Sequence, residues 1–284
     1  MVRIEEYEGR VSAWCPGCGN FGILGALKEA LVQLNKQPHE VLIVSGIGQA
    51  AKLPHYLKCN TLNGLHGRSL PPATGAKLAN PWLTVFAVGG DGDGYGEGGN
   101  HFLHTARRNP DITYLVHDNL VYALTKGQAS PTSELGFVTK LTPHGATMPL
   151  NPLAVAIAAE ATFVARGYVG DQEHLVQLIC KGVQHKGFSL IDILQPCVSY
   201  NHKNTYEWYS KRVYRLDGEK DYNPGDRFAA FKKSQEWGDR IPIGVIYQGQ
   251  RPTLEDNFPA LKAGPLTDQS IDPKRVGALL EQFT

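Results

Sequence analysis

A glycine-rich segment between two short apolar runs most strongly limits how this chain can fold. Residues 83–88 and 112–117 are β-rich runs, and the glycines of 89–99 and a helical segment separate them. Strand, loop, helix, strand is a βαβ unit, and parallel strands joined in this way end at the same edge of a sheet. Asp91 follows the first strand and Asn119 the second. We therefore expect both side chains at the carboxyl edge, where open α/β sheets bind ligands.

The residue types at that edge indicate the ligand. Asp91 and Asn119 offer hard oxygen ligands, which suit Mg²⁺, and Mg²⁺ leaves its other positions to phosphate oxygens and water. The glycines allow backbone N–H groups to approach phosphates, and the following helix N-terminus favours negative charge. A tight turn with a solvated acid is the alternative. Gly-Asp-Gly after a strand, with an Asn past the next strand, favours a magnesium diphosphate site.

Length and charge limit the class of protein. A chain of 284 residues, 42% of them hydrophobic, is sufficient for one large α/β domain or two small ones. The formal net charge of +1 gives no indication of nucleic-acid binding. No apolar run approaches the roughly 20 residues of a membrane span, and the polar start lacks a signal peptide, so we expect no membrane association and a cytoplasmic location. Five cysteines there argue against a disulfide framework and leave metal binding or catalysis open.

The alternation of strands and helices over residues 13–197 predicts a doubly wound, mainly parallel α/β sheet. Besides the central unit, we expect strands at 41–44, 61–65, 162–166 and 188–194, and helices at 22–34, 71–80, from 151 onward, and 171–185. Asn20 is placed to cap the first of these helices and Asp171 the last. The predicted domain therefore spans residues 1–200. Residues 201–284 have weak periodicity and are interpreted as a C-terminal extension that packs on the domain or on a partner subunit.

Seven sequence blocks, in order, resemble a known family. They are Trp14-Cys-Pro-Gly-Cys-Gly, Ser45-Gly-Ile-Gly, Leu65-His-Gly-Arg, Gly90-Asp-Gly-Asp, His117-Asp-Asn, Leu124-Thr-Lys-Gly-Gln-Ala-Ser-Pro-Thr and Gln195-Pro-Cys. Over residues 13–200 they resemble the β subunit of 2-oxoacid:ferredoxin oxidoreductases, whose sheet is of the thiamine diphosphate-binding type. The resemblance implies oxidative decarboxylation of a 2-oxoacid with coenzyme A. The products are an acyl-CoA, carbon dioxide and two electrons for ferredoxin, and 2-oxoglutarate and then pyruvate are the candidate substrates.

The resemblance also implies roles for the residues of these blocks. The implied magnesium ligands are Asp91, Asn119 and a backbone carbonyl near Val121. The residues implied to line the diphosphate or border the thiamine are Gly46, Ile47, His66, Gly90, Asp91, Gly92, Asp93, Asn119, Val121 and Thr125. His66 is a candidate for hydrogen bonding to the diphosphate or to reaction intermediates, and Lys126 for holding the substrate carboxylate beside Thr125 and Gln128. A structural His66 and a solvated Lys126 are the alternatives.

The cysteines depart from the family pattern. Members of the family hold a 4Fe–4S cluster with four thiolates, and Cys15, Cys18 and Cys197 match three of them. The usual fourth position, after Ser-Gly-Ile-Gly, is Gln49, whose neutral amide is a poorer iron ligand than a thiolate. Cys59, ten residues further along, is the expected fourth ligand. A cluster with a non-cysteine fourth ligand, and a chain without a cluster, are the alternatives.

The resemblance further implies a partner chain. In this superfamily the glutamate that contacts the thiamine aminopyrimidine comes from a separate pyrimidine-binding domain, and this chain has room only for the diphosphate-binding domain. We therefore expect an α subunit that carries the pyrimidine domain, possibly fused to a γ domain, in an αβ dimer or an (αβ)2 assembly that is active only when complete. Thiamine then supplies the electron sink for bond breaking.

Two other functions remain as hypotheses. A non-redox thiamine decarboxylase or synthase half would need magnesium and thiamine but no iron, and the Cys-Pro-Gly-Cys loop argues against it. A zinc-binding scaffold subunit would use Cys15, Cys18, Cys59 and Cys197 as ligands and would leave Asp91 without a role. Iron and zinc analysis distinguishes the three.

Overall fold

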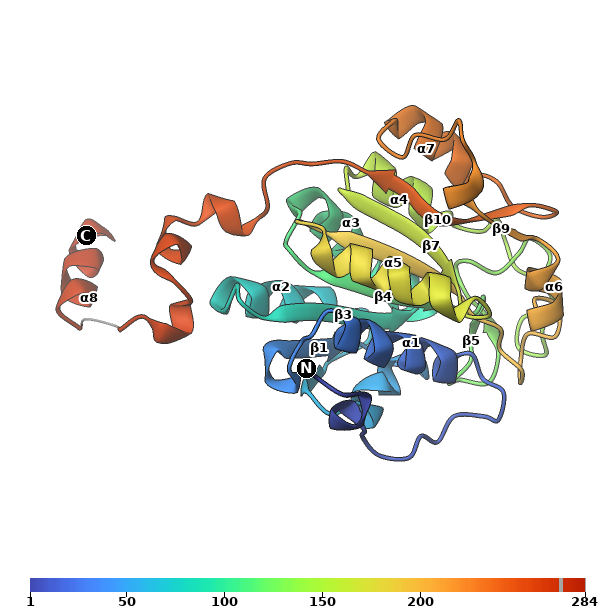
Figure 1. Cartoon of the computed structure of the whole chain (residues 1–284), viewed down its shortest axis with the longest axis horizontal. Coiled ribbons are helices and arrows are strands. Elements are labelled where there is room, and N and C mark those ends of the chain that lie inside the picture. The colour runs from blue at the N-terminus through green and yellow to red at the C-terminus, as the bar shows by residue number, and fades with distance from the viewer. Residues whose placement is uncertain (271–272, 284) are drawn as a thin grey trace.

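The central feature of the computed structural model, which describes residues 1–270 and 273–283, is one eight-stranded sheet (Figure 1). The strand order is β2-β1-β3-β4-β8-β7-β10-β9. The strands are β1 Val41–Ser45, β2 Asn60–Asn63, β3 Thr84–Gly90, β4 Thr113–Asp118, β7 Phe163–Tyr168, β8 Ser189–Leu194, β9 Val213–Arg215 and β10 Ile241–Gln248. Every neighbouring pair is parallel except β10 with β7. The predicted doubly wound, mainly parallel fold is confirmed.

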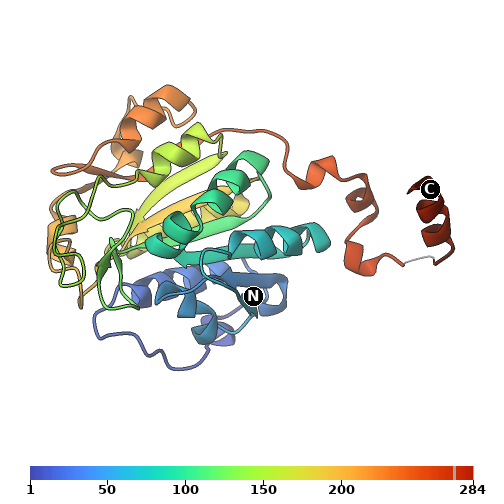
Figure 2. The same ribbon diagram turned by 180° about the vertical axis from the view of Figure 1, so that it is seen from behind.

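Helices cover both faces of the sheet. They are α1 Asn20–Gln33 and α5 Gln172–Gln184 on one face (Figure 1), and α2 Leu70–Ala79, α3 Gly99–Arg108 and α4 Pro152–Ala158 on the other (Figure 2). Side chains of β3 alternate between the two layers, with Phe86 and Val88 in the first core and Val85 and Ala87 in the second. The central strands β4, β7 and β8 are buried along their whole length because helices cover both faces there, whereas β2 at the edge of the sheet is exposed.

The ends of the helices test two of the predicted caps. Asp171 accepts a hydrogen bond from the backbone N–H of His174 at 3.4 Å, so the predicted cap of α5 is confirmed. Asn20 does not cap α1, because the helix already begins at this residue and its Oδ1 lies 2.7 Å from His117 Nδ1. This contact ties α1 to the end of β4 beneath the site.

The region after residue 200 contributes strands that the sequence did not reveal. Residues 188–194 formed the last clear strand pattern, yet β10 pairs with β7, and β9 pairs with β10 at the edge of the sheet. Pro242 and Gly244 interrupt the β10 sequence, and such residues weaken a strand pattern. The short helices α6 Tyr206–Ser210 and α7 Arg227–Ser234 complete this region.

The last part of the chain leaves the sheet as an arm (Figures 1 and 2). Its start is held by hydrogen bonds from Gly249 N to Thr162 O at 2.8 Å and from Leu254 N to Asn109 O at 3.1 Å. Helix α8, Pro273–Leu280, lies away from the body of the domain. Exposed apolar side chains along the arm are Phe258, Leu266, Val276, Leu279, Leu280 and Phe283. None of the helices in the described residues is long and apolar enough to cross a membrane.

Candidate active site

Loops that follow β1, β3 and β4 enclose a cavity of about 100 Å³ at the carboxyl edge of the sheet. Gly90 pairs with His117 across β3 and β4, so Asp91 and Asn119 lie just past two neighbouring strand ends. The predicted residues that line the cavity are Ile47, His66, Gly90, Asp91, Gly92, Asp93, Asn119, Val121 and Thr125. The structure thus brings together the side chains expected at a magnesium diphosphate site.

Asp93 connects the loops that follow β1, β2 and β3. Its Oδ1 accepts hydrogen bonds from the backbone N–H groups of Gly67 at 2.7 Å and Ile47 at 2.9 Å, and lies 2.8 Å from His66 Nδ1. Burial raises the pKa of Asp93, and the two backbone donors and His66 oppose that shift. Because Nδ1 is committed to Asp93, the other ring nitrogen of His66 is the one left for a ligand.

Gly46 and Gly94 must be glycine because neighbouring side chains occupy the space that a Cβ atom would need. A Cβ atom at Gly46 would lie 2.0 Å from Asp93 Oδ2, and one at Gly94 would lie 1.9 Å from the Tyr114 hydroxyl oxygen. Both distances are far shorter than a van der Waals contact. Glycine at these positions therefore allows Asp93 and Tyr114 to reach the loop.

Asp91 is buried rather than solvated, with 1% of its surface exposed. Its Oδ2 lies 2.7 Å from Thr132 Oγ1, which also lies 2.8 Å from Asp118 Oδ1. One hydroxyl hydrogen can be donated to only one acceptor, so the second contact needs a proton on a carboxyl group. Burial, with Asp192 and Asp91 nearby, raises the pKa of Asp118 well above its usual range. A protonated Asp118 can donate to Thr132, which then donates to Asp91.

Thr132 and Asp118 were not predicted as site residues, although both stand inside quoted sequence blocks. Asp118 immediately precedes Asn119, and Thr132 ends the block that begins at Leu124. Sequence spacing gave no indication that residues 14 positions apart would share a hydrogen bond. The contact depends on how the loop folds back over β4.

Of the residues predicted on the substrate side, Thr125 lines the cavity and Lys126 does not. Thr125 lines the cavity and donates a hydrogen bond from its hydroxyl to Gln128 Oε1 at 2.6 Å. Lys126 is exposed, has a positive φ of 76° and is not among the lining residues. A role for Lys126 therefore stays a prediction.

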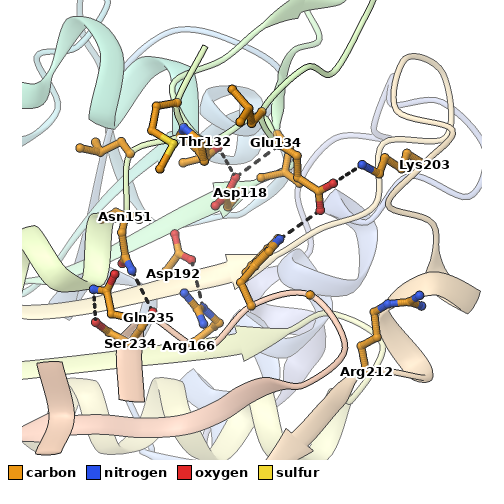
Figure 3. A pocket seen from close by; sticks show the side chains of 18 of the residues that line it. Asp118, Thr132, Glu134, Asn151, Arg166, Asp192, Lys203, Arg212, Ser234 and Gln235 are labelled. Atoms are coloured by element: carbon orange, nitrogen blue, oxygen red, sulfur yellow. Dashed lines mark hydrogen bonds and ion pairs between the residues drawn. The ribbon is translucent and has the colours of Figure 1, made fainter. Parts of the chain in front are cut away.

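A second, larger cavity of about 660 Å³ lies behind Thr132 and Asp118 (Figure 3). Arg166 of β7 and Asp192 of β8 line it, with Arg166 Nε 3.9 Å from Asp192 Oδ2. The Tyr95 hydroxyl donates to Asp192 Oδ1 at 2.8 Å. Burial raises the pKa of Asp192 to about 6, and Arg166 opposes that shift. Arg166 is 3% exposed, yet its Nε and Nη1 have no hydrogen-bond partner.

The rim of the larger cavity comes from distant segments. Glu134 forms an ion pair with Lys203 and accepts a hydrogen bond from Trp237 Nε1 at 3.0 Å. The Arg212 guanidinium lies 4.5 Å from the centre of the Trp208 ring. None of these residues was predicted as a site residue from the sequence, because no local pattern connects them.

Three of the predicted cluster cysteines share a small cavity of about 30 Å³ with Gln49. Cys15 Sγ lies 3.2 Å from the Ser199 hydroxyl oxygen, and Cys18 Sγ lies 3.5 Å from Gln195 Nε2. Burial raises the pKa of Cys18 to about 11 and also raises that of Cys197. Among the described residues, no group of three or more His, Cys, Asp or Glu side chains is already arranged to hold a metal ion.

The structure does not bring Cys59 to this cavity, which corrects the predicted ligand set. Asn60, its neighbour at the start of β2, pairs with Leu42 of β1. Cys59 therefore lies at the amino ends of these parallel strands, whereas Gln49 follows their carboxyl ends. The Cys59 sulfur lies 3.3 Å from Asn60 O, and burial raises the pKa of its thiol to about 12. Residues 49 and 59 are close in sequence, but the chain between them runs from the carboxyl edge of the sheet back to the amino edge. Their short separation in sequence therefore did not place them at one site.

Two family models match this chain. Residues 43–193 match the model described as "Thiamine pyrophosphate enzyme, C-terminal TPP binding domain". Residues 197–263 match the model of the C-terminal part of the pyruvate ferredoxin oxidoreductase beta subunit. The first match contains all the residues of the smaller cavity, and the second begins at Cys197.

Characterised relatives are similar over most of the chain. A protein of Saccharolobus solfataricus named 2-oxoacid:ferredoxin oxidoreductase subunit beta is 49% identical, covering 84% of this chain and 82% of its own. Subunit beta of 2-oxoacid:ferredoxin oxidoreductase 1 of Aeropyrum pernix is 47% identical, covering 95% of this chain and 87% of its own. A solved structure of 2-oxoglutarate:ferredoxin oxidoreductase from Magnetococcus marinus, with 2-oxoglutarate, coenzyme A and succinyl-CoA bound, is 34% identical. It covers 98% of this chain and 96% of its own, with a TM-score of 0.90.

Proposed function

The chain belongs to the β subunits of the 2-oxoacid:ferredoxin oxidoreductases, and from this premise we propose that it binds thiamine diphosphate through Mg²⁺ at the smaller cavity. Membership confirms the resemblance drawn from the seven sequence blocks and the assignment to an oxidoreductase that acts on 2-oxoacids. The observation that carries the proposal is the placement of Asp91 and Asn119 past the ends of neighbouring strands, on one cavity.

The residues at this edge fit the proposed metal and diphosphate. Asp91 and Asn119 supply a carboxylate and an amide oxygen, and the backbone carbonyl at Val121 completes a set of hard ligands. Thr132 holds one oxygen of Asp91, which fixes how the carboxylate is presented. When bound, thiamine diphosphate supplies the electron sink for decarboxylation. The chain's own residues position it.

The remaining residues of the cavity support binding and substrate recognition. Gly90 and Gly92 border the diphosphate, while Asp93 holds the loops of Ile47 and His66 against it. The free ring nitrogen of His66 is the proposed hydrogen-bonding group toward the diphosphate. Thr125 and Lys126 lie on the substrate side, where an ammonium group attracts a 2-oxoacid carboxylate.

A 4Fe–4S cluster on Cys15, Cys18 and Cys197 is the proposed electron acceptor. These three thiols line one cavity, and hydrogen-bond donors face the sulfurs of Cys15 and Cys18. Cluster formation would deprotonate the thiols, which offsets the burial that raises the pKa of Cys18 and Cys197. Gln49, Asn119 and Ala123 line both this cavity and the diphosphate cavity. The cluster would therefore lie directly beside the site where electrons are released, on the way to ferredoxin.

A partner subunit follows from family membership, because the relatives are named as β subunits. The proposed α subunit supplies the pyrimidine-binding domain and its glutamate, in an αβ or (αβ)2 assembly. The exposed apolar residues of the arm, such as Val276 and Leu280, provide a surface for such a partner. The solved relative with bound 2-oxoglutarate and coenzyme A makes 2-oxoglutarate the first candidate substrate and pyruvate the second.

The experiment uses the chain co-expressed with its α subunit and purified anaerobically. We expect Mg²⁺-dependent binding of thiamine diphosphate, measured by calorimetry, and reduction of ferredoxin that requires a 2-oxoacid and coenzyme A. Asp91→Ala should weaken thiamine diphosphate binding at least about a hundredfold. The exposed acid variant Glu173→Ala, on helix α5, is the matched control and should bind normally.

Three outcomes of that experiment would count against the proposal. Unchanged thiamine diphosphate affinity in Asp91→Ala would refute the proposed magnesium site. An iron-free preparation that binds thiamine diphosphate would favour the non-redox alternative. Zinc without thiamine diphosphate binding would favour the scaffold alternative.

A further inference from the structure

The sulfurs of Cys15, Cys18 and Cys197 differ from the other thiols of the chain in what surrounds them. Hydroxyl and amide donors face Cys15 and Cys18, at 3.2 Å from Ser199 Oγ and 3.5 Å from Gln195 Nε2. Cys197 is buried and lines the same cavity as these two sulfurs. Donors of this kind stabilise thiolates that hold a cluster.

Cys59 and Cys180 lie outside this cavity, and each sulfur lies near a backbone carbonyl oxygen. Cys59 Sγ lies 3.3 Å from the backbone oxygen of Asn60, and Cys180 Sγ lies 3.8 Å from that of Ala30. A carbonyl oxygen accepts a hydrogen bond from a thiol and repels a thiolate. These two cysteines are therefore built as protonated thiols. Only three of the chain's cysteines are placed as cluster ligands.

Gln49 lines the thiol cavity together with Trp14, Asn119 and Gln195. Its backbone oxygen accepts a hydrogen bond from Trp14 Nε1 at 2.8 Å, which fixes the main chain there. Its side-chain Oε1 is buried and has no hydrogen-bond partner. A buried amide oxygen without a hydrogen-bond partner is unfavourable, so its presence beside three thiols requires an explanation. A metal ion bound on that side would provide the missing partner.

We propose that the cluster site of this chain has three thiolate ligands and the amide oxygen of Gln49, so that one iron of the cluster is weakly held and exchangeable. The inference rests on the cluster in the proposed function and specifies its fourth ligand. An oxygen atom is a harder and weaker ligand for iron in a sulfide cluster than a thiolate. Because Gln49 also lines the diphosphate cavity, the weakly held iron faces the thiamine side.

Release of the weakly held iron on oxidation can be written with atoms and electrons in balance. A 4Fe–4S cluster in its 2+ state contains two ferric and two ferrous ions on the formal count. Loss of one Fe²⁺ and transfer of one electron to ferricyanide leave three ferric ions and four sulfides, which is a 3Fe–4S cluster of charge 1+. No thiolate ligand has to leave in this step. A cluster with four thiolates would have to lose a thiolate-bound iron.

The test uses the complete complex with its α subunit, purified anaerobically and treated with about one equivalent of ferricyanide per cluster. For the native chain we expect release of about one iron in four and the spin-half resonance signal of a 3Fe–4S cluster. Gln49→Cys should keep its four irons under the same treatment. Gln49→Leu, which has no oxygen ligand, should lose iron at least as readily as the native chain. Cys59→Ser should behave as the native chain does.

Equal resistance of the native chain and Gln49→Cys would overturn the inference, and so would a lower iron content in untreated Cys59→Ser than in the untreated native complex. Thiamine diphosphate binding is measured separately on the native complex, so neither result would count against the proposed cofactor site. A native complex that binds thiamine diphosphate but contains no iron would instead refute the cluster in the proposed function. The two failures are therefore distinguishable.

Discussion

Two cavities lie on either side of the hydrogen bonds that join Asp91 through Thr132 to Asp118, and they are built in different ways. The smaller one is enclosed mainly by loops that directly follow β1, β3 and β4, and its residues fall in short sequence blocks. The larger one takes Glu134, Arg166 and Trp237 from segments that share no motif (Figure 3). The difference shows that a motif identifies a site when its parts lie on consecutive strand ends, and fails when the site is assembled from separate regions.

The two cavities also differ in how their charges are held. Asp93 Oδ1 in the smaller cavity is in contact with two backbone donors and His66. In the larger cavity, Arg166 relies on a long contact of 3.9 Å to Asp192, and two of its nitrogens have no partner. The smaller cavity is therefore preorganised for a ligand. The larger one contains the buried pair of Arg166 and Asp192, whose hydrogen-bonding groups are only partly satisfied. A change in this pair should therefore alter the folding stability of the chain more than its binding of a ligand.

The largest effect is expected from Arg166→Met, which alters only the larger cavity. It removes the cation beside buried Asp192, and breaking such a pair costs about 3 kcal/mol or more. Urea unfolding of the purified chain measures this loss. Thiamine diphosphate affinity of the folded complex should stay within about twofold, since the residue does not line the smaller cavity. A larger drop in affinity would show that the two cavities act as one.

A smaller effect is expected from Gly46→Ala, which alters only the smaller cavity. The added Cβ atom would lie 2.0 Å from Asp93 Oδ2 and must displace that carboxylate. Overpacking of this kind costs about 1–3 kcal/mol, and thiamine diphosphate affinity should fall with it. Gly25→Ala on α1 is the matched control, because nothing lies within 4 Å of its added Cβ. Normal binding by Gly46→Ala would refute the role assigned to Asp93.

Thr132→Val tests the connection between the cavities. The substitution keeps the shape of the side chain but removes the hydroxyl between Asp91 and Asp118. Loss of a group that orients a metal ligand should weaken Mg²⁺-dependent thiamine diphosphate binding about tenfold, measured by calorimetry. Thr132→Ser keeps the hydroxyl and should bind nearly as the native chain does. If both variants bind alike, the hydroxyl does not orient Asp91.

The smallest effect is expected in the pH dependence of stability. Burial raises the pKa of Asp192 to about 6, above the ordinary value of 3.8, so the folded state favours its protonated form. This contribution is complete below about pH 4 and is lost as the pH rises through about 6. Relative to Asp192→Asn, the native chain should lose about 1 kcal/mol between about pH 5 and about pH 7. Parallel stability curves of the two proteins in urea unfolding would contradict the shifted pKa.

Several elements show how far prediction from sequence extended. The strands at 41–44, 112–117 and 188–194 were predicted because each is a short run rich in apolar residues, as expected of strands covered on both faces. Strand β10 was missed because Pro242 and Gly244 break its pattern, and its pairing with β7 is decided by contacts remote in sequence. Likewise, Asn20 had a residue type suited to capping, but its contact with His117 could only be seen once α1 lay over β4.

The sequence by itself determined that Asp91 lies near Asn119 and that Cys15 lies near Cys18. In the first pair a single βαβ connection brings consecutive strand ends together, and in the second only two residues separate the sulfurs. Only the tertiary structure decided which residue completes the thiol cavity and what lies behind Asp118. The register of β1 with β2 puts Cys59 at the far edge of the sheet and leaves Gln49 beside the three thiols. Such choices depend on the packing of distant segments, because side chains far apart in sequence become neighbours only when the whole sheet has formed.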